Sequence, residues 1–136
     1  MTKTFTVAGK GGVGKTAISS MLIDLLSQKG VVLAIDADPS TNLNNALGLP
    51  LEATVGDARE DVTEEITKGR TNPGVSKQDL LDRKIREALV ESSKVDLLAM
   101  GRPEGPGCDG AAHQRLRASR ERLAKPYVYG GVERAA

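Results

Sequence analysis

The segment 9–16 combines glycines, lysines and a hydroxyl in an order that can hold a polyphosphate. It reads Gly-Lys-Gly-Gly-Val-Gly-Lys-Thr. The glycine, lysine and threonine at its end fit the triphosphate-loop pattern G-x-x-x-x-G-K-[ST], whereas its alternating glycines fit the dinucleotide pattern G-x-G-x-x-G. Asp36 also stands where the ribose-binding acid of a dinucleotide site would lie. Two binding chemistries therefore compete for this segment.

The chemistry of the two ligands favours a triphosphate. A dinucleotide site holds its pyrophosphate on backbone amides and does not require a lysine at the helix start. A triphosphate carries more charge, and Lys15 supplies a cation for it while the Thr16 hydroxyl supplies a ligand for Mg²⁺. A dinucleotide site and a glycine-rich turn without a ligand remain the alternatives. The predicted nucleotide-binding residues are Gly9, Lys10, Gly11, Gly12, Val13, Gly14, Lys15 and Thr16.

The elements around this segment predict an α/β fold. Residues 3–8 have the alternation of a short strand, and residues 31–35 form a continuous apolar run of strand length. Between them, residues 15–29 carry apolar side chains at helical spacing, and Gly30 marks the helix end. Strand, helix and strand predict a pair of parallel strands with a right-handed crossover. The apolar face expected to pack on the sheet consists of Ile18, Met21, Leu22, Leu25 and Leu26.

The rest of the chain carries weaker signals. A third buried strand is expected at residues 95–100, and the polar loop 101–108 follows it. The apolar residues of 127–136 show no clear helical or strand periodicity. The fold class is thus a parallel sheet with flanking helices, in a domain 1–110 followed by a basic helix and tail, 111–136. Further helices are expected at 42–47 (closed by Gly48), at 62–68, at 76–92 (opened by a capping box at Ser76) and at 112–124.

Composition and charge indicate a soluble domain and give little support for nucleic acid or a membrane as the partner. The chain has 136 residues, 39% hydrophobic and 27% charged, which is typical of one soluble domain. Its net charge of +1 gives no general argument for nucleic acid or membrane as a partner. Residues 111–136 hold six basic and two acidic side chains, a pattern also found on solvated helix faces. The single cysteine, Cys108, excludes a disulfide within the chain and favours a cytoplasmic location.

A second lysine in the loop, Lys10, narrows the range of protein families that the segment 9–16 resembles. The run Lys-Gly-Gly-Val-Gly-Lys-Thr resembles the deviant Walker A motif of the dimeric ATPases that include nitrogenase iron protein, the partitioning ATPases and metal-cluster assembly ATPases. This resemblance implies an α/β P-loop fold, ATP and Mg²⁺ as ligands, and a nucleotide-dependent homodimer in which Lys10 reaches the partner's phosphates. The alternative for Lys10 is a solvated loop lysine.

The segment 36–42, Asp-Ala-Asp-Pro-Ser-Thr-Asn, resembles the switch I segment of that family. The resemblance implies that Asp38 orients the attacking water and that Asp36 holds the Mg²⁺ shell through water. Lys10, Lys15 and Asp38 are the implied catalytic residues, and Thr16 is the implied direct ligand of Mg²⁺. The alternative is that both acids serve a turn at the end of a strand.

A third segment, 94–108, is similar to the accessory ATPases that mature nickel carbon monoxide dehydrogenase (the CooC type). Members of that family carry a Cys-x-Cys pair that binds a metal ion between two subunits. Cys108 fits the first cysteine, but Gly110 occupies the second position. The resemblance implies Zn²⁺ or Ni²⁺ at Cys108 in a dimer, with carbon monoxide dehydrogenase as the client. His113 as a further ligand and Cys108 as an inert thiol are the alternatives.

This resemblance is placed between Thr4 and about Cys108, whereas family members continue through a switch II aspartate and further strands. We therefore expect a fragment, a frameshifted reading frame or an incomplete gene. Residues 127–132 stand where the family's next strand would begin, but without its acid. Hydrolysis of ATP is expected only if the missing half is supplied. A partitioning or positioning ATPase on DNA or a membrane surface, and an inactive nucleotide binder, are the alternatives to nickel insertion.

Overall fold

The computed structural model describes residues 3–102 and the backbone of the strand 129–135. The chain begins with strand β1, and helices and strands then alternate in the manner of an α/β protein. In chain order the elements are β1 (Lys3–Gly9), α1 (Lys15–Ser27), β2 (Val32–Asp36), α2 (Leu43–Leu47), α3 (Val55–Thr67), α4 (Lys77–Ala88), β3 (Val95–Ala99) and β4 (Tyr129–Ala135).

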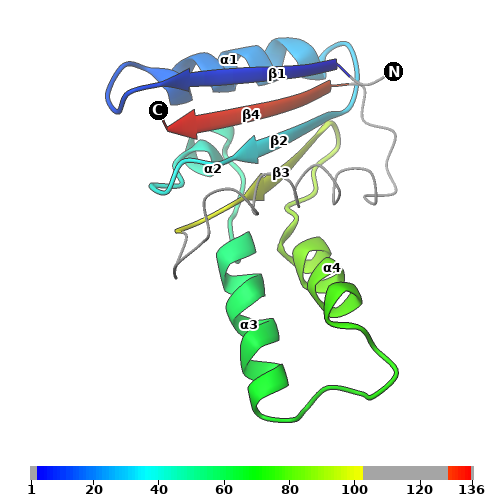
Figure 1. The fold of residues 1–136 in the computed structure, drawn as a ribbon. Coiled ribbons are helices and arrows are strands. Elements are labelled where there is room, and N and C mark those ends of the chain that lie inside the picture. Colours follow the sequence, from blue (N-terminus) through cyan, green and yellow to red (C-terminus); the bar gives the residue numbers. More distant parts are fainter. Residues whose placement is uncertain (1–2, 103–128, 136) are drawn as a thin grey trace.

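The four strands form one parallel sheet in the order β1-β4-β2-β3 (Figure 1). The predicted α/β fold with a parallel sheet is therefore confirmed. The expectation that β1 and β2 pair directly is wrong, because β4 lies between them and pairs with β1 over residues 129–135 and with β2 over residues 129–133. This central strand lies within residues 127–136, whose apolar residues show neither a helical nor a strand period.

The core lies on both faces of β2, all five residues of which are buried. Successive side chains of a strand point to opposite faces. Leu33 and Ile35 accordingly join a cluster with α3 and α4, while Val32 and Ala34 join a second cluster with α1 and α2. Because β2 is a parallel strand covered on both faces, its short aliphatic run suffices to build the core there. Figure 1 shows α3 and α4 extending together away from the sheet.

Helix α1 packs on the sheet through a face that only partly matches the predicted one: Leu26 packs against the core and Leu22 is half-buried, as predicted. Its bounds agree with the prediction to within two residues, but its buried side chains are Lys15, Ser19 and Ile23. Ile18, Met21 and Leu25, which were expected in the core, are 54%, 60% and 59% exposed. Apolar residues occupy more of the helix circumference than the sheet covers, so periodicity alone could not identify the buried face.

Helices α3 and α4 begin at capping side chains. Ser76 accepts a hydrogen bond from the backbone N–H of Asp79, as the sequence predicted. Helix α3 starts at Val55 rather than at the predicted Val62, because Thr54 and Asp57 form a complete capping box. The ammonium of Lys84 on α4 lies 3.6 Å from Asp61 and 3.4 Å from Glu65 on α3, so ion pairs join the two helices.

The chain leaves β3 through a turn packed against the start of α3. Gly101 has φ of 72°, and a Cβ built on it would lie 2.4 Å from Oγ1 of Thr54. The backbone N–H of Gly56 donates to the carbonyl of Met100 at 3.0 Å. The end of β3 is thereby fixed to the N-terminus of α3.

We expect Gly101→Ala to lower the free energy of unfolding by about 2 to 4 kcal/mol, because it combines a left-handed backbone with a steric clash. Gly69 is the matched control, since it has φ of 64° and open space around its Cβ position. Gly69→Ala should cost only about 1 kcal/mol. Urea denaturation of the two variants measures both values, and equal losses would show that the Thr54 contact contributes nothing.

Candidate nucleotide-binding site

The segment 9–16 forms a loop from the carboxyl end of β1 to the start of α1. Gly12 and Gly14 have φ of 78° and 92°, so the loop uses backbone conformations that side chains other than glycine rarely adopt. Gly14 is also the N-cap of α1, which therefore begins without a side-chain cap and has no acid in its first turn. Helices α3 and α4, by contrast, are capped by Thr54 and Ser76. The start of α1 is thus suited to an anion, which its dipole attracts.

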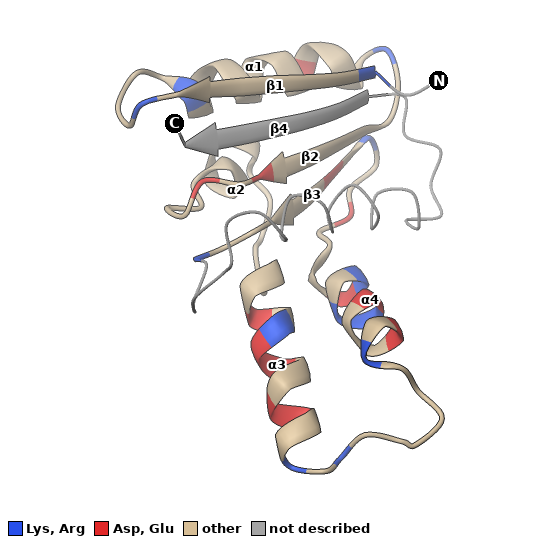
Figure 2. Ribbon diagram, in the orientation of Figure 1, with Lys and Arg blue, Asp and Glu red and all other residues tan. Residues whose placement is uncertain are grey.

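Lys15 is held at the centre of this loop. Its side chain is 6% exposed, and its Nζ donates to the carbonyl of Gly9 at 2.8 Å and to that of Lys10 at 3.3 Å. The same Nζ lies 3.6 Å from Oδ2 of Asp38. The loop therefore surrounds a buried ammonium group. Figure 2 shows basic positions in the loop from β1 to α1 and acidic positions at the end of β2.

Asp38 uses its two carboxylate oxygens differently. Oδ1 accepts hydrogen bonds from the backbone N–H of Ser40 at 3.0 Å and from the Ser40 hydroxyl at 2.7 Å. Oδ2 faces Lys15. The hydrogen bonds from Ser40, and then the positive charge of Lys15, hold the pKa of Asp38 below its ordinary value. Asp38 is therefore an ionised group next to the phosphate loop.

Asp36 is 1% exposed and organises the turn that follows β2. Its Oδ1 accepts from the backbone N–H of Asp38 at 3.0 Å, and its Oδ2 accepts from that of Leu43 at 3.1 Å. Burial raises the pKa of Asp36, and the backbone hydrogen bonds from Leu43 and Asp38 partly oppose this effect. The turn also contains Thr41 at φ of 50°. Both acids therefore shape the turn, as the alternative in the sequence analysis proposed, and Asp38 also faces the loop.

The residues present fit a triphosphate with a divalent cation. An uncapped helix start, a buried lysine and two carboxylates at the carboxyl edge of a parallel sheet meet in one place, where such sheets bind ligands. Lys10 and Val13 are exposed on the same loop, Val13 by 63%. Thr16 begins the first turn of α1 next to Lys15.

The predicted metal site at Cys108, with Gly110 and His113, lies outside the described residues. Within residues 3–102 and 129–135 there is no group of three His, Cys, Asp or Glu side chains that could hold a metal ion. Over the same residues, no helix has the length and hydropathy needed to cross a membrane.

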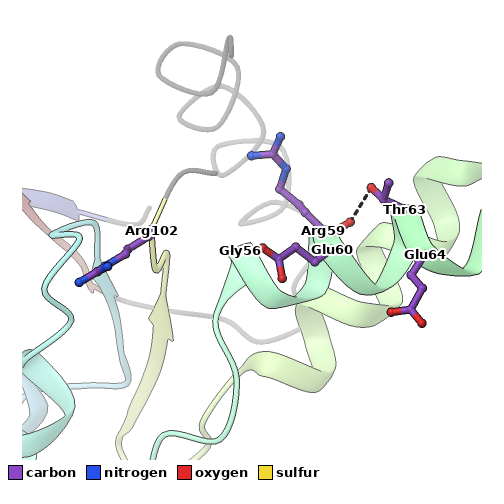
Figure 3. A pocket seen from close by; sticks show the side chains of 6 residues that line it. All are labelled: Gly56, Arg59, Glu60, Thr63, Glu64 and Arg102. Atoms are coloured by element: carbon purple, nitrogen blue, oxygen red, sulfur yellow. Dashed lines mark hydrogen bonds between the residues drawn. The ribbon is translucent and has the colours of Figure 1, made fainter. Parts of the chain in front are cut away.

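A cavity of about 370 Å³ lies elsewhere, on the outer side of α3 (Figure 3). It has no residue in common with the phosphate loop. Its two arginines, Arg59 and Arg102, point in different directions, and two glutamates share its lining, so its charges do not converge on one ligand. Nothing in the sequence pattern predicted this cavity. It is lined by Gly56, Arg59, Glu60, Thr63, Glu64 and Arg102.

Comparison with known proteins agrees with this geometry. Residues 4–130 match the model of the CobQ/CobB/MinD/ParA nucleotide binding domain. An uncharacterized ATP-binding protein of Methanocaldococcus jannaschii is 45% identical over 96% of this chain and 52% of its own length. The carbon monoxide dehydrogenase accessory protein CooC of Rhodospirillum rubrum is 37% identical over 82% of this chain and 46% of its own length.

Solved structures show the same fold. A ParA family ATPase from Chlorobium tepidum superposes with a TM-score of 0.62 at 20% identity, over 99% of this chain and 52% of that one. Apo McdA of Cyanthece superposes with a TM-score of 0.61 at 25% identity, over 99% of this chain and 50% of that one. The chain thus spans about half the length of the relatives it matches. The family match continues to residue 130, beyond the stretch from Thr4 to about Cys108 in which the sequence placed the resemblance to CooC-type ATPases.

Proposed function

Because the chain belongs to the CobQ/CobB/MinD/ParA nucleotide-binding domain family, we propose that its segment 9–16 binds ATP with Mg²⁺ and that Asp38 directs the hydrolysis of ATP to ADP and phosphate. The observation that carries the proposal is the buried ammonium of Lys15, held by the carbonyls of Gly9 and Lys10 beside Asp38. These contacts hold the ammonium group beside the uncapped start of α1, where a phosphate group would bind.

The residues take the following parts in the reaction. Lys15 binds the β- and γ-phosphates, and the backbone of the glycine-rich loop surrounds them. Asp38 accepts a hydrogen bond from the attacking water and orients it toward the γ-phosphorus. Thr16 holds Mg²⁺, which when bound neutralises charge on the phosphate oxygens.

Two further roles concern the cation and the dimer. Asp36 would hold the shell of Mg²⁺ through water, from its position at the end of β2. Lys10 is exposed on the loop, so its ammonium group is accessible to the phosphates of a second subunit in a nucleotide-dependent homodimer.

The same proposal extends to a client. The 37% identity to the CooC protein of Rhodospirillum rubrum, together with the loop that ends at Cys108, supports nickel insertion into carbon monoxide dehydrogenase as the purpose of hydrolysis. Partitioning or positioning on DNA or a membrane surface is the competing function. The ParA-like structures at 20% identity support the fold alone and do not favour it.

Metal retention by the purified chain distinguishes these functions. We expect Ni²⁺ or Zn²⁺, measured by mass spectrometry after gel filtration with MgATP, to elute with a dimer and to be lost in Cys108→Ser, because thiolates bind these ions tightly. Ser27→Ala, a change on α1 remote from Cys108 in sequence, is the control. ATP-dependent binding of DNA that weakens steeply with salt, without retained metal, would instead favour the partitioning function.

A further inference from the structure

The turn between β2 and α2 (Figure 1) contains a residue, Thr41, in an unusual backbone conformation. Its φ is 50°, and among the residues that the structure describes every other positive φ belongs to a glycine. A side chain that branches at Cβ rarely adopts this left-handed region, because it crowds the backbone there. Such a conformation persists only where the surrounding contacts impose it. The turn therefore holds backbone strain at Thr41.

The contacts that impose this conformation lie on both sides of Thr41. Its backbone N–H donates to the carbonyl of Asp38 at 3.1 Å, and its hydroxyl donates to the same oxygen at 3.4 Å. Two residues further on, the backbone N–H of Leu43 donates to Oδ2 of Asp36 at 3.1 Å. Asp36 and Leu43 are each 1% exposed, so both ends of the turn are fixed in the core. The strain is therefore maintained by two anchored ends.

The same turn determines where the carboxylate of Asp38 lies. Ser40 holds Oδ1 of this carboxylate through its backbone N–H at 3.0 Å and its hydroxyl at 2.7 Å. Oδ2 lies 3.6 Å from Nζ of Lys15. Thr41 holds the carbonyl of Asp38 while Ser40 holds its side chain, so the strained backbone and the Asp38–Lys15 contact belong to one arrangement of residues 38–41.

We propose that the strain at Thr41 weakens the Asp38–Lys15 contact and is released when a phosphate group replaces Asp38 at the ammonium group; this inference rests on the proposed binding of ATP. Thr41 is thus a positioning residue that acts through Asp38. Its strain raises the free energy of the arrangement that contains the contact and of no other, so it favours displacement of Asp38 by the ligand. A residue that adopts a positive φ without strain would stabilise the contact and lower the affinity for MgATP.

The backbone of Thr41, rather than its hydroxyl, carries this effect. The hydroxyl bond to the carbonyl of Asp38 is long at 3.4 Å, and the backbone N–H of Thr41 already donates to that oxygen at 3.1 Å. Thr41→Val keeps the branched Cβ and its strain but removes the hydroxyl. Thr41→Asn relieves the strain, because asparagine adopts the left-handed region more readily than other side chains. The two variants therefore separate the two possible origins of an effect at this position.

Urea denaturation without nucleotide tests the strain independently of the proposed ATPase. We expect Thr41→Asn to raise the urea midpoint above that of the wild-type chain. Thr71→Asn is the matched control, because it makes the same change at a half-buried loop position where φ is not positive, and it should not raise the midpoint. The gain from Thr41→Asn should disappear in an Asp38→Ala background, since the contacts of the Asp38 side chain help to impose the strain.

Calorimetry with MgATP tests the release of the strain by the ligand. Thr41→Asn should weaken binding by roughly three- to tenfold, whereas Thr41→Val should bind as tightly as the wild-type chain. An unchanged urea midpoint in Thr41→Asn, a gain that persists in the Asp38→Ala background, or unaltered MgATP affinity in a stabilised Thr41→Asn would each overturn the inference. Absence of MgATP binding in the wild-type chain would overturn the proposed function instead, and the urea results would then decide the presence of strain alone.

Discussion

Replacing Lys15 with alanine is expected to weaken MgATP binding by about a hundredfold or more, which corresponds to roughly 3 kcal/mol. The ammonium is already buried at the centre of the loop, where its Nζ is 2.8 Å from the carbonyl of Gly9. A charge positioned in advance interacts with phosphate oxygens at low cost in reorganisation, and its removal leaves the negative charge of the ligand without a buried partner. Isothermal titration calorimetry with MgATP measures the change.

Two controls separate charge from folding. Lys29→Ala removes the same charge from an exposed position just beyond α1 and should leave the affinity unchanged. Lys15→Met retains most of the side-chain volume, so a loss of affinity in this variant as well would locate the effect in the ammonium. Circular dichroism should show both Lys15 variants folded. Unaltered heats of binding in folded Lys15→Ala would contradict the assignment of segment 9–16 as the phosphate site.

The parts of this fold that the sequence could predict are those determined by local chemistry. Segment 9–16 required glycine where φ is positive, and Gly12 and Gly14 are found there. The Ser76 cap and the αL glycine that ends α2, Gly48, were likewise readable from neighbouring residues. Such features depend on a few adjacent side chains, so the tertiary fold does not alter them.

The features that escaped prediction depend on distant parts of the chain. Strand β4 has two glycines and two charged residues, and its seven residues become a strand because β1 and β2 provide hydrogen-bond partners on both sides. The buried face of α1 also depends on how far the sheet extends beneath it. For the same reason the sequence placed Asp36 and Asp38 at a strand end but could not show that Asp38 contacts Lys15.

That contact leads to the second large expected effect: Asp38→Asn should reduce ATP hydrolysis by about a hundredfold or more while binding of MgATP is retained or strengthened. In the structure, Oδ2 of Asp38 lies 3.6 Å from Nζ of Lys15. Phosphate oxygens would compete for that ammonium, and Oδ2 would then be free to accept a hydrogen bond from water. An asparagine lacks the negative charge that competes with phosphate for the Lys15 ammonium. It also lacks the negative charge that orients the water. Phosphate release and calorimetry measure the two effects separately.

The pH dependence of stability provides an independent check on the same pair. Because the pKa of Asp38 is held below its ordinary value, its folded state favours the carboxylate, and the resulting stability is present above the unfolded pKa near 3.8. This contribution is lost as the pH falls through the lower, folded pKa. The wild-type chain should therefore lose stability on acidification more steeply than Asp38→Asn. Thr63→Ala, an exposed change on α3 that alters no titratable group, should follow the wild type. Parallel curves for all three chains, together with hydrolysis at the wild-type rate in Asp38→Asn, would place the attacking water under the control of another residue.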